Sequence, residues 1–182
     1  NTDTGELSAK TFVAEISNPS YIAYSPNKKF VYSVSEDSDG IISAFKVEKD
    51  GKLTFLNSVS ANGAHPCHIA VDELGEKIVV SNYTSGTVSV HAVLKDGYLS
   101  EASQVFNHTN KNEASHAHAA QFFKDQLYVA DLGRNAIYKY QLIEKAYVLK
   151  DSSIVEMTEN TGPRHFSMTK NGEFIYVINE YG

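Results

Sequence analysis

Three residues of the sequence have side chains that together could act on a carbonyl compound: His116, Arg164 and Glu180. An arginine binds anionic groups or polarises a carbonyl, and a histidine titrates near neutral pH and can transfer protons. A carboxylate beside them can align either group. If the three side chains converge, they can anchor an anionic substrate and catalyse proton transfer. The simpler alternative is that Arg164 and Glu180 only form an ion pair between two strands.

These residues lie in a sequence that repeats itself. Four segments align with one another at intervals of about 47 to 50 residues, and they begin at Asn18, His65, His116 and Gly162. Each repeat contains short alternating apolar runs bounded by turn residues, such as CHIAVD, KIVVSN, TVSVHAV and YLSEASQV in the second repeat. Four strands in a repeat of this length predict one blade of a β-propeller. The predicted fold class is therefore all-β, with four-stranded antiparallel blades.

The division into blades follows from where the repeat starts and stops. Residues 1–17 match only the last strand of a blade, and residues 162–182 match only the first half of one. Three whole blades are expected between them, at about 18–64, 65–114 and 115–161. A closed ring of roughly six to eight blades would be about twice as long as this chain. The sequence therefore predicts about half of a ring, whose open sheet edges the remaining blades cover.

Comparison of the repeats with one another separates scaffold positions from exceptional ones. Apolar columns are expected in the core, and they include Val34, Val80, Ala130 and Ile178. One polar column is interpreted as hydrogen-bonding groups shared between blades: Tyr21, His68, His118 and His165. Another is interpreted as polar groups that bond nearby backbone: Ser35, Asn82, Asp131 and Asn179. Among these, His68, His118 and Asn179 are also expected to contact a substrate.

His116 and Arg164 interrupt columns of the repeat. His116 stands where the other repeats carry proline, and Arg164 stands where they carry Ser, Cys and Ala. Glu180 ends the second strand of its blade, in a mixed column with Glu36, Tyr83 and Leu132. Because the second strand runs antiparallel to the first, all three residues should lie at one end of the ring, near the mouth of its channel. His116, Arg164 and Glu180 are therefore the predicted catalytic residues.

Composition and charge exclude several other classes of protein. The formal net charge is −6 at pH 7 and no cluster of Lys or Arg occurs, so nucleic acid is not an expected partner. No apolar run reaches the length of about 20 residues that spans a bilayer, so a membrane is not expected either. Cys67 is the single cysteine, which rules out an internal disulfide and favours a cytoplasmic location.

The motifs of several other chemistries are missing from the sequence. It contains no G-x-S-x-G, no H-E-x-x-H, no paired C-x-x-C and no glycine-rich phosphate loop. His116 and His118, two residues apart on a strand, could bind a metal ion if a carboxylate joined them. Apart from that alternative, no metal and no cofactor are expected.

Several segments together resemble a known family: HPCHIAVD, SNYTSGTVSV, GYLSEASQV, SHAHAAQF, LYVADLGRNAIYKY, GPRHFSM and FIYVINE. They are similar to the seven-bladed propeller lactonases, which include bacterial 6-phosphogluconolactonases and fungal carboxy-muconate cyclases. The resemblance covers nearly the whole chain and implies a seven-bladed ring. It also implies that the family's active-site histidine, arginine and glutamate fall on His116, Arg164 and Glu180. A further family arginine would lie in a later blade, beyond this chain.

The function that the resemblance implies is hydrolysis of a sugar lactone, with 6-phosphogluconolactone, converted to 6-phosphogluconate, as the expected substrate. The expected partners are this small anionic lactone and the remaining blades of the same propeller. A carboxy-muconate cycloisomerase needs the same anion-binding arginine and a proton donor, and is the alternative enzyme. A non-catalytic propeller that serves as a binding platform is the alternative from a different class.

Overall fold

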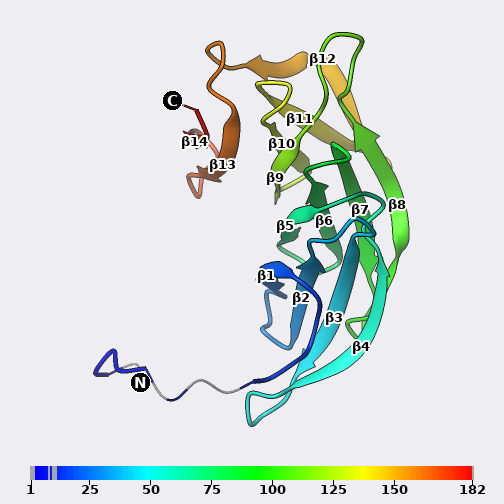
Figure 1. The fold of residues 1–182 in the computed structure, drawn as a ribbon, viewed down its shortest axis with the longest axis vertical. Helices are drawn as coiled ribbons and strands as arrows, with labels where there is room; N and C mark the ends of the chain where they lie inside the picture. Colours follow the sequence, from blue (N-terminus) through cyan, green and yellow to red (C-terminus); the bar gives the residue numbers. More distant parts are fainter. Residues whose placement is uncertain (1–2, 8, 10–11, 182) are drawn as a thin grey trace.

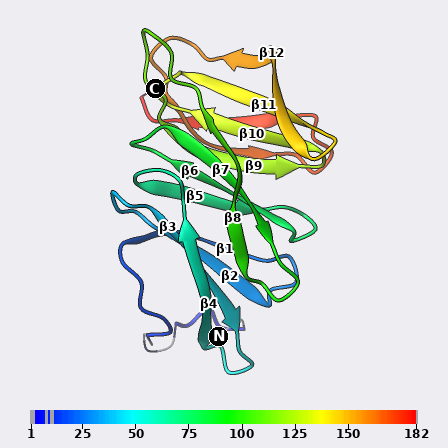
Figure 2. The same ribbon diagram turned by 90° about the vertical axis from the view of Figure 1, so that its right-hand side faces the viewer.

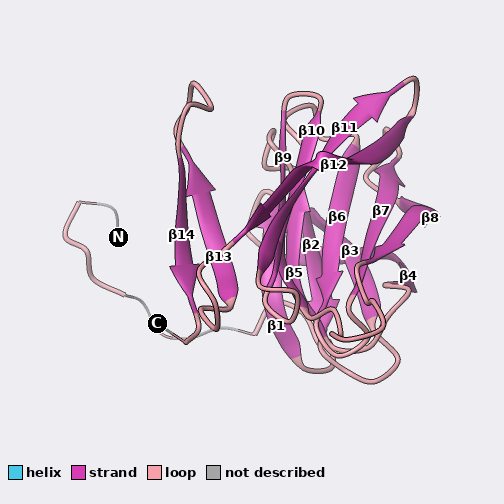
Figure 3. Ribbon diagram, turned by 90° about the horizontal axis from the view of Figure 1, so that it is seen from above, coloured by secondary structure: helices cyan, strands magenta, loops and turns pink. Residues whose placement is uncertain are grey.

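The computed structural model describes residues 3–7, 9 and 12–181, and their regular elements are all β-strands (Figure 3). The strands form separate antiparallel sheets in chain order. The first sheet contains β1 (Pro19–Tyr24), β2 (Phe30–Ser35), β3 (Ile41–Val47) and β4 (Leu53–Ser60). The second contains β5 (Pro66–Val71), β6 (Lys77–Asn82), β7 (Thr87–Val93) and β8 (Leu99–Asn107). The third contains β9 (Ala117–Phe123), β10 (Gln126–Asp131), β11 (Ala136–Ile143) and β12 (Ala146–Glu156), and the last contains β13 (Pro163–Met168) and β14 (Ile175–Asn179).

The sheets are arranged as blades around part of a ring. Figure 1 shows an arc with β1, β5, β9 and β13 along its inner side and β4, β8 and β12 along its outer side. Figure 2 shows the four-stranded sheets stacked on one another. Neighbouring inner strands contact each other directly, β1 with β5, β5 with β9 and β9 with β13. The predicted all-β propeller architecture is confirmed, and the described part of the chain forms an open arc.

The hydrophobic core lies between the blades. Successive side chains of a strand point to opposite faces, so a strand between two blades must be apolar on both. In β6, Ile78 and Val80 pack against the first sheet, whereas Val79 packs against the third. The outermost strand β8 has one face towards solvent and, after the buried Leu99, alternates between partly buried and exposed side chains. This pattern explains why the inner strands of each repeat read as continuous apolar runs.

One expectation about the edges of the arc is wrong. Val34, Val80 and Ala130 are fully buried as predicted, but Ile178 is 71% exposed. Ile178 lies on β14, and no further sheet in the described ranges covers its outer face. None of the described residues in 1–17 is in a strand, and residues 1–2, 8 and 10–11 lie outside the described part of the chain. The strand expected there stays a prediction, since such a strand needs a neighbour to pair its backbone groups.

No helix in the described part of the chain has the length and apolarity needed to cross a membrane.

Candidate active site

Each inner strand of the second to fourth blades begins with a bulge that changes the direction of one side chain. In the last blade, Pro163 pairs with Asn179 and His165 pairs with Ile178, which leaves Arg164 as the extra residue. The same pairing leaves Cys67 as the extra residue of β5 and His118 as that of β9. A β-bulge bends the strand and re-aims the bulged residue. Cys67, His118 and Arg164 therefore occupy equivalent positions at the inner side of the arc.

This pairing corrects the sequence alignment of the third blade by one residue. The alignment matched His118 with His68 and His165, and His116 with the prolines. In the structure Ala117 pairs with Asp131 as Pro66 pairs with Asn82, so Ala117 is the equivalent of the prolines. His116 instead accepts a backbone hydrogen bond from Leu132, as His65 does from Tyr83. The offset was invisible in the sequence because the position of a bulge depends on which strand residues pair.

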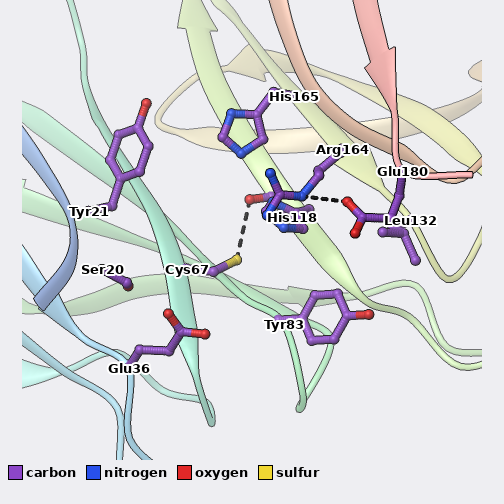
Figure 4. A pocket seen from close by; sticks show the side chains of 10 residues that line it. All are labelled: Ser20, Tyr21, Glu36, Cys67, Tyr83, His118, Leu132, Arg164, His165 and Glu180. Carbon is purple, nitrogen blue, oxygen red and sulfur yellow. Dashed lines mark hydrogen bonds and ion pairs between the residues drawn. The ribbon is translucent and has the colours of Figure 1, made fainter. Parts of the chain in front are cut away.

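A cavity of about 440 Å³ opens at the inner end of the blades (Figure 4). One set of lining residues comes from the start of the inner strands: Ser20, Tyr21, Cys67, His118, Arg164 and His165. The other set directly follows the second strand of each blade: Glu36, Tyr83, Leu132 and Glu180. All four members of the mixed sequence column thus line the cavity. The repeat brings residues from four blades to one place.

Arg164 and Glu180 form an ion pair in the wall of this cavity. Arg164 Nε donates to Glu180 Oε2 at 2.6 Å, and the two side chains are 46% and 40% exposed. The sequence alternative of an ion pair between two strands is thus correct. The pair also lies in the cavity wall, where the predicted catalytic residues were expected. The pair has no other hydrogen-bond partner within the described residues, so the two terminal guanidinium nitrogens of Arg164 remain available to a ligand.

Three histidines cluster beside Arg164. The ring centre of His165 is 5.0 Å from that of His118 and 5.7 Å from that of His68. Burial, the charge of Arg164 and His165 lower the pKa of His118 to about 4. Burial, His165 and His118 lower the pKa of His68 to about 3, and burial and Arg164 also lower the pKa of His165. The cluster is therefore uncharged at neutral pH.

The hydrogen bonding of this cluster agrees in part with the expected role between blades. His68 Nδ1 accepts a hydrogen bond of 3.4 Å from the backbone N–H of Ala120 in the next blade. His118 Nδ1 is buried and has no protein partner in the described part of the chain. His118 lines this cavity, whereas His68 lines a second cavity of about 320 Å³ together with Tyr21 and Gln121. Of the two, His118 is the one that a ligand can reach.

His116 lies beside the cavity and does not line it. Its Nδ1 donates to the backbone carbonyl of Tyr83 at 3.0 Å, and its ring stacks on the Tyr83 ring with the centres 4.9 Å apart. Because a carbonyl only accepts, Nδ1 carries a proton, and Nε2 is the ring nitrogen that can exchange one. Tyr83 itself lines the cavity, so His116 is separated from it by one aromatic ring.

Asp131 holds His116 in place from the scaffold. Its carboxylate accepts from the His116 backbone N–H at 2.9 Å, from the Ser115 hydroxyl at 2.5 Å and from His108 Nδ1 at 2.8 Å. Burial alone would raise the pKa of Asp131, but these hydrogen bonds outweigh it and lower the pKa. Ser115 donates to the aspartate and not to His108, so the trio is not a nucleophile-activating triad. Its role is structural, as predicted for this column.

Asn82 and Asn179, which share the sequence column of Asp131, differ from each other in their hydrogen bonds. Asn82 Nδ2 donates to the backbone carbonyl of Ala61 at 2.9 Å, which confirms the expected backbone contact. Asn179 Oδ1 is buried without a partner among the described residues, and Asn179 does not line the cavity.

Cys67 is not a catalytic nucleophile in this environment. Its thiol donates to the backbone carbonyl of His118 at 3.4 Å. Burial, and secondly the charge of Glu36, raise its pKa to about 12. A thiol becomes nucleophilic only as the thiolate, so Cys67 stays inert at neutral pH.

The described residues include no group of three histidine, cysteine or acidic side chains arranged to hold a metal ion. His116 and His118 do not form the shared ligand pair considered from the sequence, since one packs on Tyr83 and the other lines the cavity.

Sequence reasoning did not single out Glu36, Tyr83, Cys67 or His165, although all four line the cavity. A signal was present, because Glu36 and Tyr83 share a column with Glu180. The position of that column, directly after the second strand, was treated as evidence for Glu180 alone.

Comparison with known proteins agrees with this architecture. The family described as lactonase, 7-bladed beta-propeller, matches residues 1–182. A 6-phosphogluconolactonase of Bacillus subtilis is 34% identical over 99% of this chain and 54% of its own length. One of Formosa agariphila is 32% identical over 99% of the chain and 55% of its own length. The chain thus spans about half the length of these curated relatives.

Solved structures show the same relationship. A Bacteroides fragilis protein, described as a candidate 6-phosphogluconolactonase, superimposes with a TM-score of 0.86 at 34% identity, over 99% of this chain and 55% of its own. A periplasmic gluconolactonase of Pseudomonas aeruginosa has a TM-score of 0.90 at 24% identity, over 99% of this chain and 56% of its own, and supports the fold alone. The chain belongs to the seven-bladed β-propeller lactonase family.

Proposed function

We propose that the protein containing this chain hydrolyses a sugar lactone, and that 6-phosphogluconolactone, converted to 6-phosphogluconate, is the first substrate to test. The observation that carries the proposal is the half-exposed Arg164–Glu180 pair in a cavity where four blades meet. The names of the two curated relatives support the choice of substrate. Residues 18–64, 65–114 and 115–161 act as blades and 162–182 as a half blade, and the remaining blades of the ring complete the cavity.

Arg164 polarises the lactone carbonyl. Its Nε is bound to Glu180, which fixes the plane of the guanidinium and leaves the two terminal nitrogens to donate. As water adds to the carbonyl carbon, negative charge develops on the carbonyl oxygen, and a cation positioned beforehand stabilises that charge. Glu180 therefore acts by holding Arg164 in position.

His116 is the proposed proton carrier. Because the Tyr83 ring separates it from the cavity, it acts through a bridging water molecule. In the uncharged form its Nε2 takes up, through that water, the proton of the attacking water, and the imidazolium returns it to the ring oxygen when the bond between that oxygen and the carbonyl carbon breaks. The products are a hydroxyl group and a carboxylic acid, which releases its proton to solvent and becomes a carboxylate. Neutral His118 binds the hydroxyl groups of the substrate, and His68 and Asn179 support the site without lining this cavity.

The cycloisomerase alternative is not favoured. A carboxy-muconate carries several carboxylates, but the described cavity wall has two carboxylates, Glu36 and Glu180, against one guanidinium. The curated relatives named above are also lactonases.

The test is hydrolysis of 6-phosphogluconolactone by the complete protein, corrected for spontaneous ring opening. Arg164→Ala should lower kcat/KM by about 100-fold or more, because one preorganised oxyanion donor contributes that much. His116→Ala should lower kcat by a similar factor and flatten the pH profile, whereas the matched variant His118→Ala should mainly raise KM.

Lys46→Ala is the control, because it removes a cation from the exposed ion pair with Glu48, away from the cavity. Unchanged turnover in Arg164→Ala would overturn the proposal. Loss of kcat in His118→Ala but not in His116→Ala would move the proton-transfer role to His118.

A further inference from the structure

Two carboxylates line the cavity, and only one of them has a partner. Glu180 is bound to Arg164, whereas the side chain of Glu36 forms no hydrogen bond or ion pair with any residue in the described ranges. Glu36 directly follows β2 in the first blade and occupies the same column as Glu180 in the last. Its backbone N–H bonds Asn18, so the backbone that carries it is held by the blade. The free carboxylate is thus presented to the cavity by a fixed backbone.

The charges of Glu36 and Arg164 both reach the part of the cavity that lies between them. Cys67 lies between them in Figure 4. Burial is the main cause of the raised pKa of the Cys67 thiol, the charge of Glu36 raises it further, and the charge of Arg164 opposes that effect. A group at the position of Cys67 therefore experiences both charges. The cavity has an acidic end at Glu36 and an end at Arg164 where the cation is already paired.

The histidines do not compensate for this negative charge. The pKa values of His118 and His165 are lowered, so both are neutral at neutral pH. The charged side chains of the described wall are then Glu36, Glu180 and Arg164, whose formal sum is negative. Such a wall is unfavourable for a phosphate dianion and favourable for hydroxyl groups, which can donate to a carboxylate.

We propose that Glu36 is a specificity-determining residue, whose carboxylate accepts hydrogen bonds from the hydroxyl groups of an aldonolactone and repels a phosphate from that end of the cavity. The inference rests on the proposed lactonase function and refines its substrate class. The uncharged, hydroxylated face of the lactone lies at Glu36, and the phosphate of a phosphorylated lactone points away from the first blade. An unphosphorylated aldonolactone suits this side of the cavity better.

The experiment compares two substrates, glucono-1,5-lactone and its 6-phosphate, with the complete protein and its Glu36→Gln variant. Glutamine keeps the shape and removes the charge. We expect kcat/KM to fall about threefold for the unphosphorylated lactone, because a charged acceptor is replaced by a neutral one. It should rise about threefold for the phosphorylated lactone, because a repulsion is removed. The preference for the phosphorylated lactone should thus change by about tenfold.

Two controls isolate the effect. Glu101→Gln removes the same charge from an exposed position on β8, the outermost strand of the second blade, and should leave the preference unchanged. The difference between Glu36→Gln and the unsubstituted protein for the phosphorylated lactone should also shrink in 0.5 M salt, at a screening length of roughly 4 Å.

The possible failures are distinguishable. If both lactones are hydrolysed and Glu36→Gln changes their kcat/KM values by the same factor, the role of Glu36 is overturned and the lactonase function stands. If the unsubstituted protein hydrolyses neither lactone, the proposed function itself is overturned, and the inference with it.

Discussion

Among the close pairs of ionisable side chains in the described part of the chain, His108–Asp131 and Arg164–Glu180 lie in opposite surroundings. His108 and Asp131 are 2.8 Å apart with side chains only 4% and 0% exposed, whereas Arg164 and Glu180 are 2.6 Å apart and nearly half exposed. His108 also bonds Tyr140 and stacks on Tyr138 at 3.6 Å, and Asp131 has further donors. The pair at Arg164 has no other partner in the described part of the chain. Buried polar groups with every partner in place serve the fold, and a pair with unused donors beside a cavity can serve a ligand.

The largest effect should come from breaking the buried pair. Asp131→Ala removes the acceptor for His108, Ser115 and the His116 N–H. We expect the free energy of unfolding to fall by about 4 kcal/mol, since a buried partner left alone carries its full desolvation cost. Urea denaturation measures this, with the isosteric Asp131→Asn as the milder control. A variant as stable as its parent would remove the distinction between the two pairs.

The histidine cluster should make stability depend on pH. His118 has a folded pKa of about 4, below its unfolded value, so the unfolded state binds more protons below pH about 6.5. The contribution of His118 to the free energy of unfolding should therefore be fully present above that pH. About 3 kcal/mol of it should be lost as the pH decreases towards 4. Urea denaturation at several pH values tests this, and His118→Gln should make the dependence less steep. A flat profile between pH 7 and pH 4.5 would show that the cluster is not buried as described.

A smaller effect is expected at the exposed pair, and on activity more than on stability. Glu180→Ala should change the free energy of unfolding by less than about 1 kcal/mol, as for other exposed ion pairs. It should lower kcat/KM for the lactone by about 30-fold, because Arg164 loses the contact that orients it. If Glu180→Ala destabilised the protein as much as Asp131→Ala while leaving kcat/KM intact, Glu180 would belong to the scaffold.

The sequence was sufficient for the blades because their signal is local. Alternation and turn residues recur in every repeat, so the strands could be predicted from short runs. The exposure of Ile178 could not be predicted the same way, because burial depends on neighbouring sheets.

The site was predictable to a similar extent. Arg164 was found because it interrupts a column of small residues. Glu180 was found because it ends the second strand of its blade, which returns to the same end of the ring. The one-residue offset in the third blade was not predictable, since a bulge is set by pairing, and it reverses which of His116 and His118 lines the cavity. Glu36 was missed because an unpaired carboxylate is recognisable only once its surroundings are known.

The most direct test of the central claim is a crystal structure of the complete protein with gluconate, the hydrolysis product of the unphosphorylated lactone, bound. We expect the gluconate carboxylate to lie within hydrogen-bond distance of the terminal guanidinium nitrogens of Arg164, with the ion pair to Glu180 retained. The hydroxyl groups should lie towards His118 and Glu36. Gluconate bound elsewhere in the ring, with Arg164 and Glu180 unchanged and out of contact, would contradict the assignment of this cavity as the active site.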